Sequence, residues 1–95
     1  MKLLSIKPSS NPDKKYDAMF DIDGKTKTVS FGAKGYSDYT QNKSKVRRML
    51  YLIRHRKNED WTKPDTAGAL SRYILWGQST SLHENIANFK RRFNL

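Results

Sequence analysis

The dipeptide Asp23-Gly24 lies between two runs of alternating apolar and polar residues, and it constrains the fold more than any other feature of the chain. The two runs cover Tyr16–Ile22 and Thr26–Phe31, and Asp-Gly readily adopts the positive φ angles of a two-residue hairpin turn. A further short strand is expected at Leu3–Ile6. The beginning of the chain therefore predicts a three-stranded antiparallel sheet.

Helical periodicity replaces this alternation in the rest of the chain. Three helices are expected, over residues 43–57, 67–76 and 82–93. Thr66 and Ser81 stand at favoured N-cap positions of the second and third helices, and Ser81 with Glu84 predicts a capping box. The fold class that follows is α+β, with a small three-stranded sheet before three helices.

These elements predict one domain over residues 1–95, with a β-ribbon at 1–31 and a basic helical half at 43–93. Thr40 or Asn42 is expected to cap the first helix. This helix carries an apolar stripe at i, i+3, i+4 and i+7. The stripe predicts one apolar face, with the basic residues on the solvent-exposed rest of the helix surface. The stripe consists of Val46, Met49, Leu50 and Ile53.

Positive charge is concentrated in the helical half. Residues 1–42 hold seven lysines against five aspartates, whereas residues 43–95 hold twelve basic against four acidic residues, within a net charge of +10. A surplus of this size is typical of a protein that faces a polyanion or an acidic protein surface, with solubility alone as the alternative. A membrane surface is a weaker alternative, because no helix is strongly apolar on its other face.

The first helix and the end of the third carry the candidate nucleic-acid contacts. Arg47, Tyr51 and Arg54 recur at i, i+4 and i+7, so two guanidinium forks flank an aromatic ring on one side of the helix. The basic end of the third helix joins them if that helix packs alongside. Tyr36 and Tyr39 stack on exposed bases or else pack over the sheet edge. The full set of candidate contacts is Lys43, Lys45, Arg47, Arg48, Tyr51, Arg54, Arg56, Lys57, Lys90, Arg91 and Arg92.

The sequence carries no recognised motif for catalysis or for a cofactor. His55 and Glu59 are four residues apart on one helix face, but two ligands do not make a metal site, and the chain has no cysteine. Gly32–Gly35 lacks the spacing of a phosphate-binding loop. We therefore expect a non-enzymatic protein without cofactor, metal or small-molecule substrate, and a small nuclease using His55 and Glu59 is the minor alternative.

Apolar segments are short throughout the chain. The longest run, Met49–Ile53, falls far below the roughly 20 residues that cross a bilayer. Met1–Ile6 carries one lysine and no adequate apolar region, so no secretory signal is expected. We expect a protein that is neither transmembrane nor secreted and has no membrane partner.

Three segments have unusual sequences at a distinctive spacing, and a basic FKRRF segment follows them. They are SFGAKGYSDYT from Ser30, RHRKNEDW from Arg54 and TAGALSRYILWG from Thr66. Together they resemble a family of small basic proteins of unassigned function found in large DNA viruses of eukaryotes and in tailed phages. The resemblance covers residues 28–93 and implies a viral protein associated with the virion. It implies no catalytic residues and no particular fold.

The sequence favours two functions. The first is a non-enzymatic viral protein that binds nucleic acid, DNA in the first instance, through phosphate contacts. Because no helix-turn-helix, zinc-finger or RRM signature occurs, such binding would be largely independent of sequence. The second is a minor capsid or other virion structural protein that docks on acidic surfaces of other virion proteins. Both place the protein in the virion or in the infected host cell.

Overall fold

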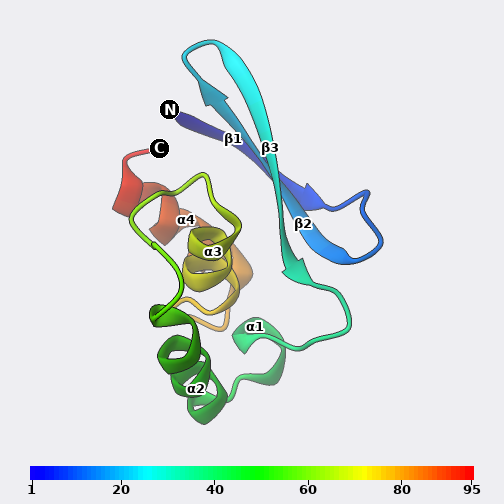
Figure 1. The fold of residues 1–95 in the computed structure, drawn as a ribbon, viewed down its shortest axis with the longest axis vertical. Coiled ribbons are helices and arrows are strands. Elements are labelled where there is room, and N and C mark those ends of the chain that lie inside the picture. The colour runs from blue at the N-terminus through cyan, green and yellow to red at the C-terminus, as the bar shows by residue number, and fades with distance from the viewer.

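The computed structural model describes all residues from 1 to 95 and has an α+β fold, which confirms the predicted class (Figure 1). Three strands come first, and they are β1 (Lys2–Pro8), β2 (Lys14–Ile22) and β3 (Lys25–Ala33). The helical elements that follow are α1 (Tyr39–Asn42), α2 (Lys45–Arg56), α3 (Ala67–Leu70), the π-helical turn η1 (Ser71–Leu75) and α4 (Leu82–Phe93). The longest helices, α2 and α4, have 12 residues each, and no helix combines the length and apolarity needed to cross a membrane.

The sheet has the strand order β1-β2-β3, and both neighbouring pairs are antiparallel. Asp23 and Gly24 connect β2 to β3 with φ angles of 53° and 82°, as a type I′ turn requires. The register pairs Ala18 with Val29, so the apolar residues of the two strands share one face. The predicted hairpin is confirmed.

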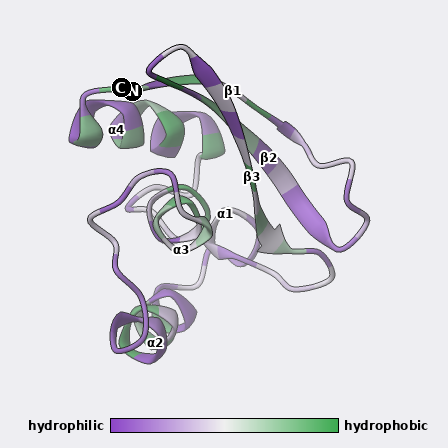
Figure 2. Ribbon diagram, turned by 45° about the horizontal axis from the view of Figure 1, so that its top comes forward, coloured by the Kyte–Doolittle hydropathy of each residue, from purple (hydrophilic) through white to green (hydrophobic).

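One face of the sheet packs against α3, η1 and α4 (Figure 2). The residues that form the centre of this layer are fully buried, and they are Ala18, Phe20, Phe31, Leu70, Ile74 and Phe89. Burying each large side chain contributes about 1.5–3 kcal/mol, so this layer holds the second and third predicted helices in place. In contrast, α2 contributes no residue to this core and lies at the edge of the molecule (Figure 2).

The predicted N-caps of the second and third helices are present. Thr66 Oγ1 accepts a hydrogen bond from a backbone N–H of α3 at 3.2 Å, and Ser81 Oγ accepts one from Glu84 N–H at 3.2 Å. The Glu84 carboxylate does not complete a capping box, because it accepts from the Ser79 hydroxyl at 3.2 Å. The second helix changes to π-helical geometry in its second half, η1, which the sequence pattern did not indicate.

The connection after β3 contains a short helix, α1, that the sequence analysis missed. Asp38 caps it by accepting a hydrogen bond from Thr40 N–H at 2.9 Å. Lys43, with a φ of 54°, then separates α1 from α2. For this reason α2 begins two residues later than predicted, with Ser44 as its N-cap in place of Thr40 or Asn42.

The face by which α2 packs differs from the predicted one. The apolar stripe is solvent-exposed, with exposed fractions between 47% and 63% for its four residues. The buried side of α2 is formed by Tyr51, whose ring stacks on that of Trp76 at a centroid distance of 4.5 Å. Arg48 Nε also donates hydrogen bonds to the carbonyls of Trp76 at 3.2 Å and Gly77 at 2.8 Å. These carbonyls lie just after η1 and have no partner within it. Because Arg48 faces them to donate its hydrogen bonds, the apolar stripe of α2 faces outward.

Candidate nucleic-acid interface

A cleft of about 600 Å³ opens where the end of β3, the loop before α1, α2 and the α3–η1 segment meet. Its rim carries Lys14, Tyr36, Arg47 and Arg54, and we call it the basic cleft. The last three residues belong to the predicted set. Lys14 was missed, because nothing in its local sequence distinguishes it from the other lysines of the sheet.

Arg47 and Arg54 form the α2 side of the basic cleft. They are seven residues apart, which corresponds to about 10 Å along the helix axis. Both side chains are exposed, and Arg47 Nη1 donates a hydrogen bond to Ser37 Oγ at 3.2 Å. The two guanidinium groups therefore line one cleft, as their spacing predicts.

No arginine of the chain forms an ion pair. The structure has two lysine–aspartate ion pairs, Lys15–Asp38 and Lys27–Asp65, and Nδ1 of His55 is hydrogen-bonded to the carboxylate of Glu59. The two carboxylates that line the basic cleft, Asp38 and Glu59, are thus each engaged by another base. Guanidinium groups without a carboxylate partner keep their donors free for phosphate oxygens.

Tyr51 lies at the floor of the basic cleft and is almost completely buried. Its ring stacks on those of Trp76 at 4.5 Å and His55 at 4.1 Å. Burial, with the negative charge of Glu59, raises the pKa of its hydroxyl well above the ordinary value. The expectation of an exposed ring between the two arginines is therefore not met. The ring instead attaches α2 to the rest of the protein.

The two tyrosines proposed for base stacking lie in different environments. Tyr36 is 75% exposed and lines the basic cleft. Tyr39 is only 6% exposed, and the Cζ atom of Arg48 lies 5.8 Å from the centre of its ring. For Tyr39 the packing alternative is correct, whereas Tyr36 remains a candidate for stacking.

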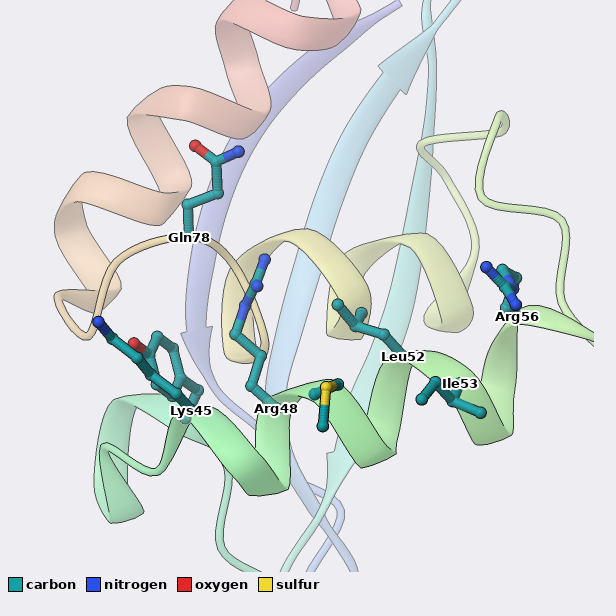
Figure 3. Close-up of a pocket in the computed structure, with 8 residues that line it drawn as sticks. Lys45, Arg48, Leu52, Ile53, Arg56 and Gln78 are labelled. Atoms are coloured by element: carbon teal, nitrogen blue, oxygen red, sulfur yellow. The ribbon is translucent and has the colours of Figure 1, made fainter.

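The other basic residues of α2 lie outside the basic cleft. Lys45, Arg48 and Arg56 line a groove on another side of α2 (Figure 3). Arg48 is occupied by its two hydrogen bonds to backbone carbonyls, so it is a structural residue rather than a free phosphate contact. Lys43 and Lys57 are exposed at the two ends of the helix.

The basic turn Lys90–Arg92 does not join the α2 residues in one surface. Because α4 buries Phe89 against η1 and the sheet, the α3–η1 segment lies between α4 and α2 (Figures 1 and 2). The condition for a shared contact surface, that the third helix packs alongside the first, is therefore not met.

His55 and Glu59 form a hydrogen-bonded pair, with Nδ1 and Oε2 3.0 Å apart. The other carboxylate oxygen, Glu59 Oε1, accepts from Trp61 Nε1 at 2.8 Å. This arrangement ties the segment after α2 back to the helix. No group of three or more histidine, cysteine, aspartate and glutamate residues lies close enough to hold a metal ion.

One family model matches residues 4–55, and its description is Family of unknown function (DUF5754). The matched residues include β2, β3 and most of β1, together with the loop that carries Tyr36 and the α2 side of the basic cleft. No curated protein and no solved structure matches the chain.

Proposed function

We propose that this chain, which belongs to DUF5754, a family of unknown function, is a small non-enzymatic protein that binds nucleic acid largely independently of sequence. One observation carries the proposal. Arg47 and Arg54 line a single cleft beside the exposed ring of Tyr36, and neither guanidinium is paired with a carboxylate. The resemblance of residues 28–93 to viral proteins leads us to place the protein in the virion.

The spacing of the two arginines suits a nucleic-acid strand. Their separation of about 10 Å along α2 corresponds to roughly three steps of one DNA strand, at about 3.4 Å of axis per step. Each guanidinium presents parallel N–H donors that match two phosphate oxygens. The net charge of +10 adds a long-range attraction that accelerates association at low salt.

Tyr36 extends the proposal from phosphates to bases. An exposed aromatic ring beside a basic groove is typical of proteins that bind single strands, because any base can stack on it. With 75% of the residue exposed, the ring is available for such contact. We therefore expect single-stranded DNA to bind at least as tightly as a duplex of the same length.

Neutralising the cleft arginines should weaken DNA binding and its dependence on salt. We expect Arg47→Gln/Arg54→Gln to reduce the affinity for a fluorescent 20-nucleotide DNA of arbitrary sequence on the order of tenfold at low salt. The slope of log Kd against log salt should fall by about 1.5, because each lost phosphate contact removes roughly 0.7–0.9. Fluorescence anisotropy at several salt concentrations measures both quantities, with single-stranded and duplex DNA.

A matched control removes the same charge elsewhere. Lys2 and Lys25 are exposed at the opposite end of the sheet, so Lys2→Gln/Lys25→Gln tests the effect of net charge alone. Arg48 is left intact in both variants because of its structural hydrogen bonds. Equal losses in the two double variants, or an unchanged salt slope in the cleft variant, would contradict the proposal.

A second candidate function, docking on an acidic surface of another virion protein, is favoured by the outer face of α2. Met49 and Ile53 are about half exposed, and both line the groove of about 420 Å³ shown in Figure 3. Exposed apolar side chains in a row along a helix are a usual feature of helix-in-groove and helix–helix interfaces. Lys45 and Arg56 flank these side chains, so charge complementarity selects a partner helix with leucine-type side chains and flanking carboxylates. A second copy of the chain would bring like charges together.

This docking face can be tested with a designed partner. An 18-residue amphipathic peptide of leucine and glutamate should bind the wild-type protein, and Met49→Ser/Ile53→Ser should weaken that binding on the order of tenfold through lost apolar contact. Isothermal titration calorimetry measures both affinities, with a scrambled peptide of the same composition as the control. Equal binding of the scrambled peptide, concentration-dependent dimerisation of the protein, or binding to anionic vesicles but not to the peptide would each contradict this function.

A further inference from the structure

A second pocket, of about 460 Å³, lies between η1 and α4, separate from the basic cleft. Three arginines line it, Arg72 from η1 and Arg91 and Arg92 from the last turn of α4, and we call it the arginine pocket. The other polar side chains of its lining are three amides and the hydroxyl of Tyr73, and no carboxylate is among them. The fold thus gathers three positive charges from distant parts of the sequence without supplying a counter-charge.

Arg72 is held rigidly at this pocket. The Cζ atom of its guanidinium lies 5.2 Å from the ring centre of Trp61 and 4.8 Å from that of Tyr73. Its Nη1 donates a hydrogen bond to the carbonyl of Trp76 at 3.3 Å. Its buried Nε–H has no acceptor anywhere in the structure. A buried donor without an acceptor is unfavourable, and such groups are rare in proteins.

The like charges around Arg72 add to this cost. The Cζ atom of Arg92 lies 4.5 Å from the ring centre of the same Tyr73. Burial lowers the pKa of the Arg72 guanidinium, and so do the nearby charges of Arg48 and Arg92. The hydrogen bond from Arg72 Nη1 to the Trp76 carbonyl has a structural role, because it caps the end of η1. It does not explain the unpaired Nε–H or the approach of two further arginines.

We propose that the arginine pocket binds a phosphate-type oxyanion. Such an anion would place its oxygens among three guanidinium groups and relieve the repulsion between Arg72 and Arg92. Guanidinium groups bind phosphate bidentately, and stacking against aromatic rings orients them in advance. The phosphate could belong to a nucleic-acid strand or to a free phosphate compound, and the two sources share this chemistry. The inference does not depend on the basic cleft.

Pyrophosphate is a suitable first probe. In NaCl-balanced buffer of constant ionic strength, a hundredfold excess over Kd should raise the Tm of the wild-type protein on the order of 10 °C. It should also shift the Nε–Hε signal of Arg72 in a ¹H–¹⁵N NMR spectrum. Arg91→Gln/Arg92→Gln should lose most of both effects. This variant is expected to fold, because both side chains are exposed.

The double cleft variant Arg47→Gln/Arg54→Gln is the matched control, because it removes the same charge from the other site. It should keep the full response to pyrophosphate. Equal responses in wild type and in Arg91→Gln/Arg92→Gln, or an equal loss in both double variants, would overturn the proposal. Arg72→Lys, which keeps the charge but loses the planar fork, should also weaken the response; an undiminished response in this variant counts against guanidinium recognition.

A competition experiment then identifies the source of the phosphate. A 10-nucleotide DNA is added to the pyrophosphate complex. If the DNA displaces pyrophosphate, the Arg72 signal moves to a new position that depends on the DNA; if it does not, the signal stays unchanged. Displacement assigns the pocket to a nucleic-acid phosphate and makes it a second contact of the proposed function. An unchanged signal supports a free phosphate compound as the ligand. This outcome says nothing about DNA binding at the basic cleft, so the two proposals can fail separately.

Discussion

Replacing Asn85 with alanine is expected to destabilise the protein by about 3 kcal/mol and to lower its Tm by roughly 15 °C. Asn85 belongs to α4, and its side chain is completely buried against the end of η1. Its Nδ2 donates to the carbonyls of Ile74 at 2.9 Å and Ser79 at 2.7 Å, and its Oδ1 accepts from Ser79 N–H at 3.0 Å. Alanine leaves the carbonyls of Ile74 and Ser79 and the N–H of Ser79 without their side-chain partner. Thermal and urea unfolding, followed by circular dichroism, measure the loss.

The neighbouring asparagine on the same helix provides the control. Asn88 lies one turn further along α4, is half-buried and accepts a hydrogen bond from Arg91. Asn88→Ala should therefore change the stability by less than about 1 kcal/mol. A similar loss in both variants would mean that the network around Asn85 is not what holds the two elements together.

Replacing Gly77 with alanine should have an effect of similar size for a steric reason. A Cβ atom at this position would lie 2.3 Å from the carbonyl oxygen of Tyr73 and 2.6 Å from Cγ of Asn85. Both neighbours are fixed, one by the backbone and the other by its hydrogen bonds, so the chain must shift. We expect a destabilisation of about 3 kcal/mol, at the upper end for overpacking in a core. Urea unfolding measures it.

Gly24 separates this steric effect from backbone strain. Nothing lies within 4 Å of a Cβ atom at Gly24, but its φ of +82° is unfavourable for alanine. Gly24→Ala should therefore cost about 1 kcal/mol, all of it backbone strain. A smaller loss for Gly77→Ala than for Gly24→Ala would contradict the steric argument.

Both predictions concern the junction at which three helical elements meet. Gly77 packs against Asn85 of α4, and its carbonyl accepts the hydrogen bond from Arg48 of α2. Trp76, immediately before it, stacks on Tyr51 of α2. The position of α2, and with it the α2 side of the basic cleft, therefore depends on this junction rather than on the apolar core.

The orientation of α2 shows how far periodicity reaches. Its apolar stripe correctly indicates a helix, since side chains three and four residues apart share a face. Which face packs inward depends on partners that lie 25 or more residues further along the chain. Tyr51 finds an aromatic ring and Arg48 finds two free carbonyls, and no pattern within α2 encodes either.

The candidate site shows the same division. The spacing of Arg47 and Arg54 was sufficient to predict that they line one surface, because both lie on a single helix. The expectation for Lys90–Arg92 failed, because it required knowledge of how two helices pack. Lys14 and Arg72 were not identified as site residues, since each gains its significance from residues far away in sequence.

The sequence by itself determined the features that depend on neighbouring residues: the Asp23-Gly24 hairpin, the caps at Thr66 and Ser81, and a surplus of positive charge in the helical half. These follow from backbone sterics, local hydrogen bonds and composition. Only the tertiary structure decided which face of α2 is exposed and that Arg72 meets Arg91 and Arg92 in one pocket. The reason is that long-range packing and hydrogen bonds to the end of η1, not helix periodicity, set how the helices are oriented.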